Sequence, residues 1–494
     1  MVEPKGERAT GPAKLEVVKE LVCTLTNDLE NATLLPSGPL PSPVSSFHCR
    51  GRVLMASAER VELLEQLKMY GRDPQFADPI FEKEGITMLL RHAFYSPSSE
   101  TARAALRVLA NAMLLKPETR QMFVNQGFAS EACGELKKEN WDNELLISRI
   151  LFLCTYGTDV DLLELIEKHR LADNIVENLN RHVKAMSTKS KSKVDPMEEL
   201  ALMETLKLLF NVTHYCNEKI SCFNAAVPHL VALLWRYDVR DEKPLDAPFG
   251  QLVNGLLNLD LGVEQCRSSL YPKRDPCKVS SRLLSLLSCA MKAYKDTDLE
   301  HTVTPLISLI DKLYENAPQA VRDQLQETLL PADEDRKAVL GRGQTLSARL
   351  LKNSTNPMTP ALRDAISHLL FDLSDKDATK FVQHVGYGFA SGFLFQNNMP
   401  VPASAAEAYS TSDSTGATKH VNPITGQFLD REQPTEGPQW TEEEKQREAE
   451  RLFVLFERLK ASGIVDVQNP VETALQEGRL QELDDDDDDD DDDD

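Results

Sequence analysis

Apolar residues recur at helical spacing through most of the chain. Leu202, Leu206, Leu209 and Phe210, for example, fall at i, i+4, i+7 and i+8. Such a stripe predicts a helix with one buried face. No sustained run alternates apolar and polar residues with period two. We therefore predict an all-α protein.

A short phrase closes several of these helical runs: one small amide or carboxylate among leucines, followed by turn residues. It occurs around Asn111, Asn211, Asn258 and Asp372. Asn211 and Asn258 are 47 residues apart, and the 100 residues between Asn111 and Asn211 make about two such periods. This period is typical of armadillo and HEAT repeats. We therefore predict an armadillo/HEAT-type superhelix with a groove that holds a peptide against a ladder of polar side chains. Each asparagine could equally cap or bridge its own backbone, and the sequence leaves both alternatives open.

Shifts in composition divide the chain into five segments. We predict an N-terminal helix and Pro/Ser-rich loop (1–55), a helical-repeat solenoid (56–399), a flexible linker (400–438), a C-terminal amphipathic helix (439–470) and an acidic disordered tail (471–494). The amphipathic helix has an apolar stripe of Leu452, Leu455, Phe456 and Leu459. A lone helix cannot bury this stripe, so we expect it to dock on the solenoid or on a partner.

Charge and cysteine content narrow the classes of function. The net charge of −23 argues against nucleic-acid binding, although Asp484–Asp494 contributes much of it. The nine cysteines form no C-x-x-C pair, which suits reduced thiols. No signal peptide or 18-residue apolar run is present, and we expect a soluble intracellular monomer. The basic, serine-rich segment 184–193 is interpreted as a solvated loop in preference to an anion site.

The sequence contains no catalytic or cofactor-binding motif of a familiar kind. H-E-x-x-H, the phosphate-binding G-x-x-x-x-G-K-[ST] and the G-x-S-x-G elbow are all missing. Gly386, Gly388 and Gly392 miss the dinucleotide-binding spacing and follow a helix, so we interpret them as a turn that closes the solenoid. We expect a binding protein without enzymatic activity, metal or cofactor.

Two basic zones stand out in an otherwise acidic chain. Lys68 and Arg72 close an early helical run, and Arg342, Arg349 and Lys352 lie in a later stretch. In one groove they would pair with the carboxylates of a bound peptide. Solvated cations that offset acidic neighbours are an equally good interpretation, and the sequence does not show which face they occupy.

The carboxyl third of the chain resembles the synembryn family. The resemblance is carried by the segments 381–392, 421–426 and 440–452, and further upstream by 149–154 and 204–212. Their order and spacing extend over most of the chain and are similar to those of a fungal-type member.

This resemblance implies a cytoplasmic signalling protein, a guanine-nucleotide releasing factor and chaperone for heterotrimeric G-protein alpha subunits in their GDP-bound or nucleotide-free state. In that family the armadillo/HEAT groove holds the alpha subunit's C-terminal helix, and the segment after the solenoid contacts its Ras-like domain. Any association with the cytoplasmic face of the plasma membrane would then run through the alpha subunit. The implied groove contacts are Lys68, Arg72, Asn111, Asn254, Arg349 and Lys352. Asn211, Asn258 and the apolar stripe of 439–470 complete the expected partner-binding set.

The chain departs from the family pattern at two places. Gln251 stands where family members can place a histidine, and Ser410, Ser412 and Ser414 have only Asp413 as an acidic neighbour, unlike the family's phosphorylated stretch. From the residues alone, the alternative is an armadillo-repeat scaffold or transport adaptor that binds extended peptides without nucleotide exchange. The asparagine pattern fits that alternative equally well.

Overall fold

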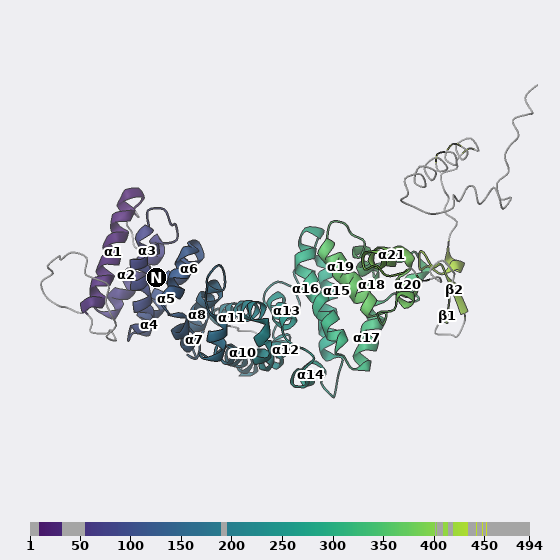
Figure 1. Cartoon of the computed structure of the whole chain (residues 1–494), viewed down its shortest axis with the longest axis horizontal. Helices are drawn as coiled ribbons and strands as arrows, with labels where there is room; N and C mark the ends of the chain where they lie inside the picture. The colour runs from purple at the N-terminus through teal and green to yellow at the C-terminus, as the bar shows by residue number, and fades with distance from the viewer. Residues whose placement is uncertain are drawn as a thin grey trace, which may run out of the picture. The chain divides into compact units, whose positions relative to one another are not determined.

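The computed structural model describes residues 9–31, 55–188, 195–400, 402, 409–412, 418–432, 441, 447 and 451. By its internal contacts the chain divides into two units, residues 1–430 and 431–494. The first unit is built of helices (Figure 1), which confirms the predicted all-α class. The apolar stripe predicted for 439–470 (Leu452, Leu455, Phe456 and Leu459) lies outside the described residues.

A series of helices runs through the first unit, and each contacts the next in the series. We call these the ladder helices: α2 (Ser57–Tyr70), α5 (Ser99–Leu115), α8 (Trp141–Cys154), α11 (Pro196–Tyr215), α13 (Phe249–Asn258), α16 (Asp296–Glu315) and α19 (Pro360–Asp372). The first three begin 42 residues apart. One helix per repeat that packs on its counterpart in the next repeat is the architecture of armadillo and HEAT arrays, as predicted.

The remaining elements pack against the ladder helices or against one another. They are α1 (Gly11–Asn31), α3 (Asp78–Phe81), α4 (Lys83–Tyr95), α6 (Glu118–Asn125), α7 (Ala129–Glu135), α9 (Leu162–Glu167), α10 (Leu171–Thr188), α12 (Val227–Leu233), α14 (Glu264–Leu270), α15 (Lys278–Ala293), α17 (Gln319–Leu329), α18 (Leu346–Asn353), α20 (Ala378–Val385) and α21 (Tyr387–Gln396), with the 3-10 helices η1 (Asn217–Ala226), η2 (Asp335–Lys337) and η4 (Leu429–Arg431). Helix α1 contacts α2, α3 and α4, so it is the first layer of the same stack.

Side-chain caps fix where several ladder helices begin. The Ser98 side chain accepts from the backbone N–H of Thr101 at the start of α5, and Asn140 caps α8 in the same way. Asp195 caps α11, and Pro196 occupies the first helical position, where a missing N–H costs nothing. These residues lie at the turns that interrupt the apolar periodicity of the sequence.

The apolar run in α8 is buried on nearly all sides, as its composition suggested. Leu146, Ile147, Ile150 and Leu151 belong to one continuous core. The exception is Phe152, which is half exposed. Because α8 contacts α5 on one side and α11 on the other, little of its surface remains for solvent.

Part of the segment expected to be a flexible linker is structured. Strands β1 (Tyr409–Ser412) and β2 (Thr418–Val421) pair antiparallel, and residues 421–428 fold back onto the helices. Arg336 is buried there and donates to the carbonyls of Gly426 and His384, at 3.0 and 2.9 Å. One buried guanidinium thus ties residues that lie far apart in sequence, a contact that local composition does not reveal.

Gly386 joins α20 to α21 with a φ of 81°, in the left-handed region that favours glycine. A Cβ at this position would lie 2.9 Å from the carbonyl oxygen of Ile424. The glycine therefore permits both the turn and the close approach of the 421–428 segment. This agrees with the interpretation of the glycine-rich stretch as a closing turn and not a nucleotide-binding loop.

Candidate functional site

The ladder helices from α2 to α16 each carry a stripe of side chains that remain at least partly exposed. On α11 the stripe contains Met203, Lys207, Phe210 and His214, which follow one another at helical spacing. The corresponding stripes contain Glu65 and Lys68 on α2, Arg103, Arg107 and Asn111 on α5, Arg149 and Phe152 on α8 with Tyr156 just beyond its end, Asn254 and Asn258 on α13, and Ser308, Asp311 and Lys312 on α16. We call this set of side chains the ladder face. It is the candidate functional site.

Ion pairs join the stripes of α2, α5 and α8. Arg107 pairs with Asp142 of α8, and its Nη1 lies 4.0 Å from Glu65 Oε1 of α2. Arg103 Nε lies 3.3 Å from the same Asp142 carboxylate. Glu65 also pairs with the predicted contact residue Lys68. The basic side chains of this region are therefore held in place by acidic neighbours on adjacent helices.

Aromatic side chains occupy the α8–α11 part of the ladder face, and the sequence reasoning did not assign them to the site. The rings of Phe152 and Tyr156 meet edge to face, with centroids 5.2 Å apart. Phe210 stacks on His214 at 6.0 Å, and Lys207 Nζ lies 6.0 Å from the Phe152 centroid. Two features of the sequence could have pointed to these aromatic residues. Phe210 belongs to the repeated phrase, and both Phe152 and Phe210 interrupt runs of leucine.

Two asparagines of the repeated phrase link neighbouring ladder helices. Asn211 Nδ2 donates to Thr155 Oγ1 at the end of α8, at 2.7 Å. Asn258 Nδ2 donates to the Phe210 carbonyl of α11 at 3.0 Å. Neither amide bonds its own helix, as one alternative had suggested. Asn211 is only 4% exposed, so its side chain is not presented to a partner. Asn111 and Asn254 remain half exposed on α5 and α13.

The later basic zone lines one pocket of about 400 Å³ together with Gly341, Gly343 and Gln344. Its cations are Arg342, Arg349 and Lys352. Arg349 Nη2 donates to Gln344 Oε1 at 2.6 Å, which orients its guanidinium. The three cations of the later basic zone therefore lie in one pocket.

The helix that carries Arg349 and Lys352 is anchored at its first turn. Thr345 caps α18, and the hydroxyls of Thr345 and Ser347 both donate to the Asp335 carboxylate, at 2.6 and 2.8 Å. The earlier basic pair, Lys68 and Arg72, lies at the end of α2, several ladder helices away in the order of contacts. The pocket is therefore lined by the cations of the later basic zone and by neither cation of the earlier zone.

One carboxyl group on the ladder face has an unusual affinity for protons. Burial, together with the nearby charges of Asp372 and Glu315, raises the pKa of Asp311 to about 7, although Lys376 acts in the opposite direction. Asp311 Oδ1 is buried and accepts no hydrogen bond from the described residues. Around neutral pH this side chain changes charge, so the net charge of the α16 part of the ladder face depends on pH.

Metal-ligand clusters, reactive thiols and membrane-spanning helices are features that bear on other classes of function. Within the described ranges, no group of three His, Cys, Asp or Glu side chains could hold a metal ion. Burial raises the pKa of the Cys133 thiol to about 12, which makes it a poor nucleophile. In the part of the chain that the structure describes, no helix is both long enough and apolar enough to span a bilayer.

Comparison with known proteins gives a family match over most of the chain. A family model described as guanine nucleotide exchange factor synembryn matches residues 63–479. A synembryn-like chaperone of Schizosaccharomyces pombe is 24% identical over 364 residues, which cover 69% of this chain and 66% of that protein. Chaperone Ric-8A of Macaca fascicularis is 23% identical over 440 residues, covering 83% of this chain and 82% of that protein.

Two solved structures resemble parts of this chain at low sequence identity. A designed armadillo repeat protein matches 58% of this chain and 99% of its own, at 14% identity and a TM-score of 0.37. An engineered protein matches 76% of this chain and 82% of its own, at 16% identity and a TM-score of 0.42.

Proposed function

The chain belongs to the guanine nucleotide exchange factor synembryn family, and from this membership we propose that it is an exchange factor and folding chaperone for heterotrimeric G-protein alpha subunits. The ladder face is the proposed binding surface, and the C-terminal helix of the alpha subunit is the proposed ligand. The observation that carries this proposal is the aromatic cluster of Phe152, Tyr156, Phe210 and Tyr215, whose side chains remain at least partly exposed on α8 and α11 and directly after α8.

An amphipathic helix needs apolar anchors on its partner. Tyr156 is 40% exposed and Tyr215 is 51% exposed, and Phe152 and Phe210 are half buried beside them. Aromatic side chains lose little conformational entropy on binding and are enriched at protein interfaces. The cluster is therefore suited to the apolar side of a helix, and the surrounding charges to its polar side.

We propose that the charged and amide residues expected from the family resemblance contribute further contacts. Lys68, Asn111 and Asn254 lie on the ladder face, and Arg72 is exposed directly after α2. Arg349 and Lys352 line the basic pocket, which is suited to a carboxylate or an acidic side chain. We leave Asn211 out of the proposed contacts because it is buried and bonded to Thr155. Asn258 keeps a half-exposed side chain and is retained.

Exchange on such a surface requires no covalent catalysis. A protein that binds the nucleotide-free conformer more tightly than the GDP-bound conformer shifts the alpha subunit toward loss of GDP. If the ladder face withdraws a helix that packs beneath the nucleotide site, that site loosens. GTP then favours the refolded conformer and releases the solenoid. The same preference for an incompletely folded subunit protects its exposed apolar surface from aggregation, which is the action of a chaperone.

The C-terminal amphipathic helix is proposed as a second contact, which covers apolar surface on the alpha subunit. We propose that the protein acts in the cytoplasm as a monomer and reaches the membrane only with its partner. Phosphorylation in the 410–414 region is not part of the proposal, because the acidic surroundings expected of that site are sparse.

The test is release of fluorescent GDP from a purified alpha subunit, with and without the full chain. A variant with His214→Asp and Tyr215→Asp places charges on the exposed edge of the aromatic cluster and should slow release at least about tenfold, a loss of about 1.4 kcal/mol. Leu163→Asp on α9 is the matched control, since Leu163 is also an exposed apolar residue but lies off the ladder helices. Peptide binding without any acceleration of release would favour the scaffold alternative and contradict the proposal.

A further inference from the structure

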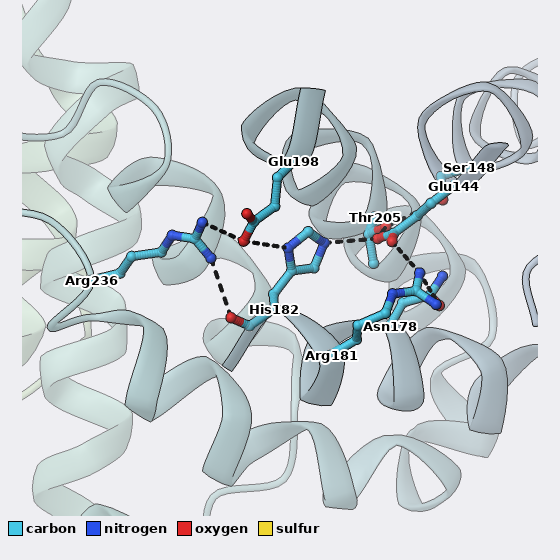
Figure 2. A network of polar contacts seen from close by, with 8 residues as sticks. All are labelled: Glu144, Ser148, Asn178, Arg181, His182, Glu198, Thr205 and Arg236. Carbon is cyan, nitrogen blue, oxygen red and sulfur yellow. Dashed lines mark hydrogen bonds and ion pairs between the residues drawn. The ribbon is translucent and has the colours of Figure 1, made fainter. Parts of the chain in front are cut away.

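A cluster of buried charges lies between α8, α10 and α11, separate from the ladder face (Figure 2). At its centre is Glu144 of α8, which is fully buried. Its carboxylate accepts from His182 Nε2 at 2.9 Å and from Thr205 Oγ1 at 2.7 Å, and it pairs with Arg181. Burial alone would raise the pKa of Glu144, but these partners outweigh burial and lower it. Glu144 is therefore a charged carboxylate shared by two cationic side chains.

The other half of the cluster is built on Glu198 of α11. Glu198 Oε1 accepts from Arg236 Nη2 at 2.6 Å and lies 3.8 Å from His182 Nδ1. Burial acts to lower the pKa of His182, but its interactions with Glu144 and Glu198 raise it overall. When His182 is protonated, two carboxylates face three cations, Arg181, His182 and Arg236. The cluster then carries one surplus positive charge.

The positively charged Arg181 side chain lies at the edge of the cluster. Its guanidinium lies 5.0 Å from the ring of Trp141, and its Nη2 bonds both Glu144 and Asn178 Oδ1. The bond to Oδ1 fixes the orientation of the Asn178 amide, because only the oxygen can accept from a guanidinium. The amide nitrogen of Asn178 must then point the other way.

Two donors are left without an acceptor at this edge. Asn178 is 1% exposed, and within the described part of the chain its Nδ2 donates to nothing. Arg181 Nε is likewise buried without an acceptor among the described residues. A buried donor that remains unpaired destabilises the fold. Two of them on adjacent turns of one helix indicate a ligand that accepts hydrogen bonds.

Both residues line a pocket of about 240 Å³ between α10 and the residues that follow α7. The pocket also presents Lys137 and Lys184, opposed by Glu139 and Glu177. Glu177 is engaged by Lys184 at 3.6 Å. A cation would meet Arg181 and two lysines here, whereas an anion would meet N–H donors and positive charge.

We propose that this pocket binds a small oxyanion, a phosphate or carboxylate group, held by Asn178 Nδ2 and Arg181 Nε with Lys137 and Lys184 at the rim. The site is distinct from the ladder face and independent of the proposed exchange activity. It also includes the first residue of the basic segment 184–193, for which the sequence favoured a solvated loop.

The experiment is a titration of the full chain with inorganic phosphate, and separately with acetate, followed by calorimetry and by the ¹⁵N side-chain amide signal of Asn178. Saturable binding that shifts this signal is expected for at least one anion. The comparison of the two ligands distinguishes a phosphate site from a carboxylate site. If neither anion binds saturably, the pocket is a hydrated cavity and the proposal is wrong.

The decisive variant is Asn178→Asp. It keeps an oxygen for the bond from Arg181 but replaces the free donor with an acceptor and a negative charge, so affinity should fall at least about tenfold. Asn217→Asp is the matched control, since it makes the same change at an exposed position outside the pocket lining, and its affinity should match that of the unaltered chain. Equal binding by Asn178→Asp and the unaltered chain would place the anion elsewhere and overturn the proposal. Thermal unfolding of both variants shows whether each remains folded.

Discussion

Asn211 on α11 donates its side-chain amide to the hydroxyl of Thr155 at the end of α8, across 2.7 Å. This bond fastens one ladder helix to the preceding one. Asn258 makes the equivalent connection from α13 back to α11. In these two repeats the asparagine therefore stabilises the stacking of one ladder helix on the preceding one.

We expect Asn211→Ala to lower the free energy of unfolding by about 1–3 kcal/mol, because it leaves the buried Thr155 hydroxyl without this partner. Chemical denaturation followed by circular dichroism measures the change. Asn111→Ala is the control, since Asn111 occupies the same place in its phrase but is half exposed, and its effect should be within about 0.5 kcal/mol. Equal effects of the two substitutions would contradict this role.

His182 should make stability dependent on pH. Its pKa is raised in the folded state above the ordinary 6.5, so the stabilisation it contributes is complete below that value and is lost as pH rises through the folded pKa. The groups that face it are Glu144, Arg181, Glu198 and Arg236. His182→Gln should destabilise the protein by about 3 kcal/mol at slightly acidic pH.

The difference in melting temperature between the unaltered chain and His182→Gln should shrink toward alkaline pH. His214→Gln is a suitable control, because His214 is exposed on α11 and should not produce such a trend. A constant difference across the pH range would mean that the stabilisation from His182 does not depend on its proton.

The effect of Asp311 on the stability of the protein should be largest above neutral pH. Its pKa of about 7 exceeds the ordinary 3.8, so the folded state favours the protonated form and loses stability as pH rises through 7. Asp311→Asn removes this penalty and should stabilise the protein by about 1 kcal/mol at alkaline pH, after allowance for partial exposure. The gain should shrink as pH falls below 7 and vanish only near the ordinary pKa of 3.8.

Thermal unfolding at several pH values tests this prediction. Asp364→Asn on α19 provides the control, because Asp364 is half exposed and pairs with Arg363 at 3.0 Å. Stabilisation by Asp311→Asn that is as large in acid as in alkali would point to a packing effect and not to the titration of Asp311.

Arg349→Glu with Lys352→Glu should abolish capture of a peptide copied from the C terminus of an alpha subunit. The pair lines the basic pocket, and reversal of both charges turns attraction for a carboxylate into repulsion. Calorimetry gives the affinity directly. Lys138→Glu with Lys168→Glu makes the same change in net charge at exposed positions off the ladder helices and should leave capture unchanged. Normal capture by the pocket variant would remove this pocket from the binding surface.

Leu452→Asp with Phe456→Asp should weaken binding to the intact alpha subunit without changing the melting of the solenoid. The substitutions disrupt the apolar stripe of the predicted C-terminal helix, which we propose as a second contact with the partner. Binding of a peptide copied from the C terminus of the alpha subunit should be unaffected. This result would distinguish the contact made by the C-terminal helix of this chain from the contact made by the ladder face. An unaltered dissociation constant for the intact subunit would show that the stripe does not take part.

The sequence alone determined the elements whose signals are local. Apolar spacing around Leu206 and Leu209 predicted the helix that the structure shows as α11, and the repeat period predicted how the helices would stack. Gly386 was interpreted correctly because a left-handed turn depends on one residue. The grouping of Arg342, Arg349 and Lys352 followed from their closeness along the chain.

Tertiary structure decided everything that depends on which distant side chains meet. His182 lies between Glu144 and Glu198 only because three helices pack together, and Arg336 holds the 421–428 segment across about ninety residues of sequence. Stacking buries Asn211, whereas Tyr215 a few positions later remains exposed. Periodicity shows that a helix has a buried face, but burial and proton affinity depend on the neighbours that cover it, and those neighbours come from other repeats.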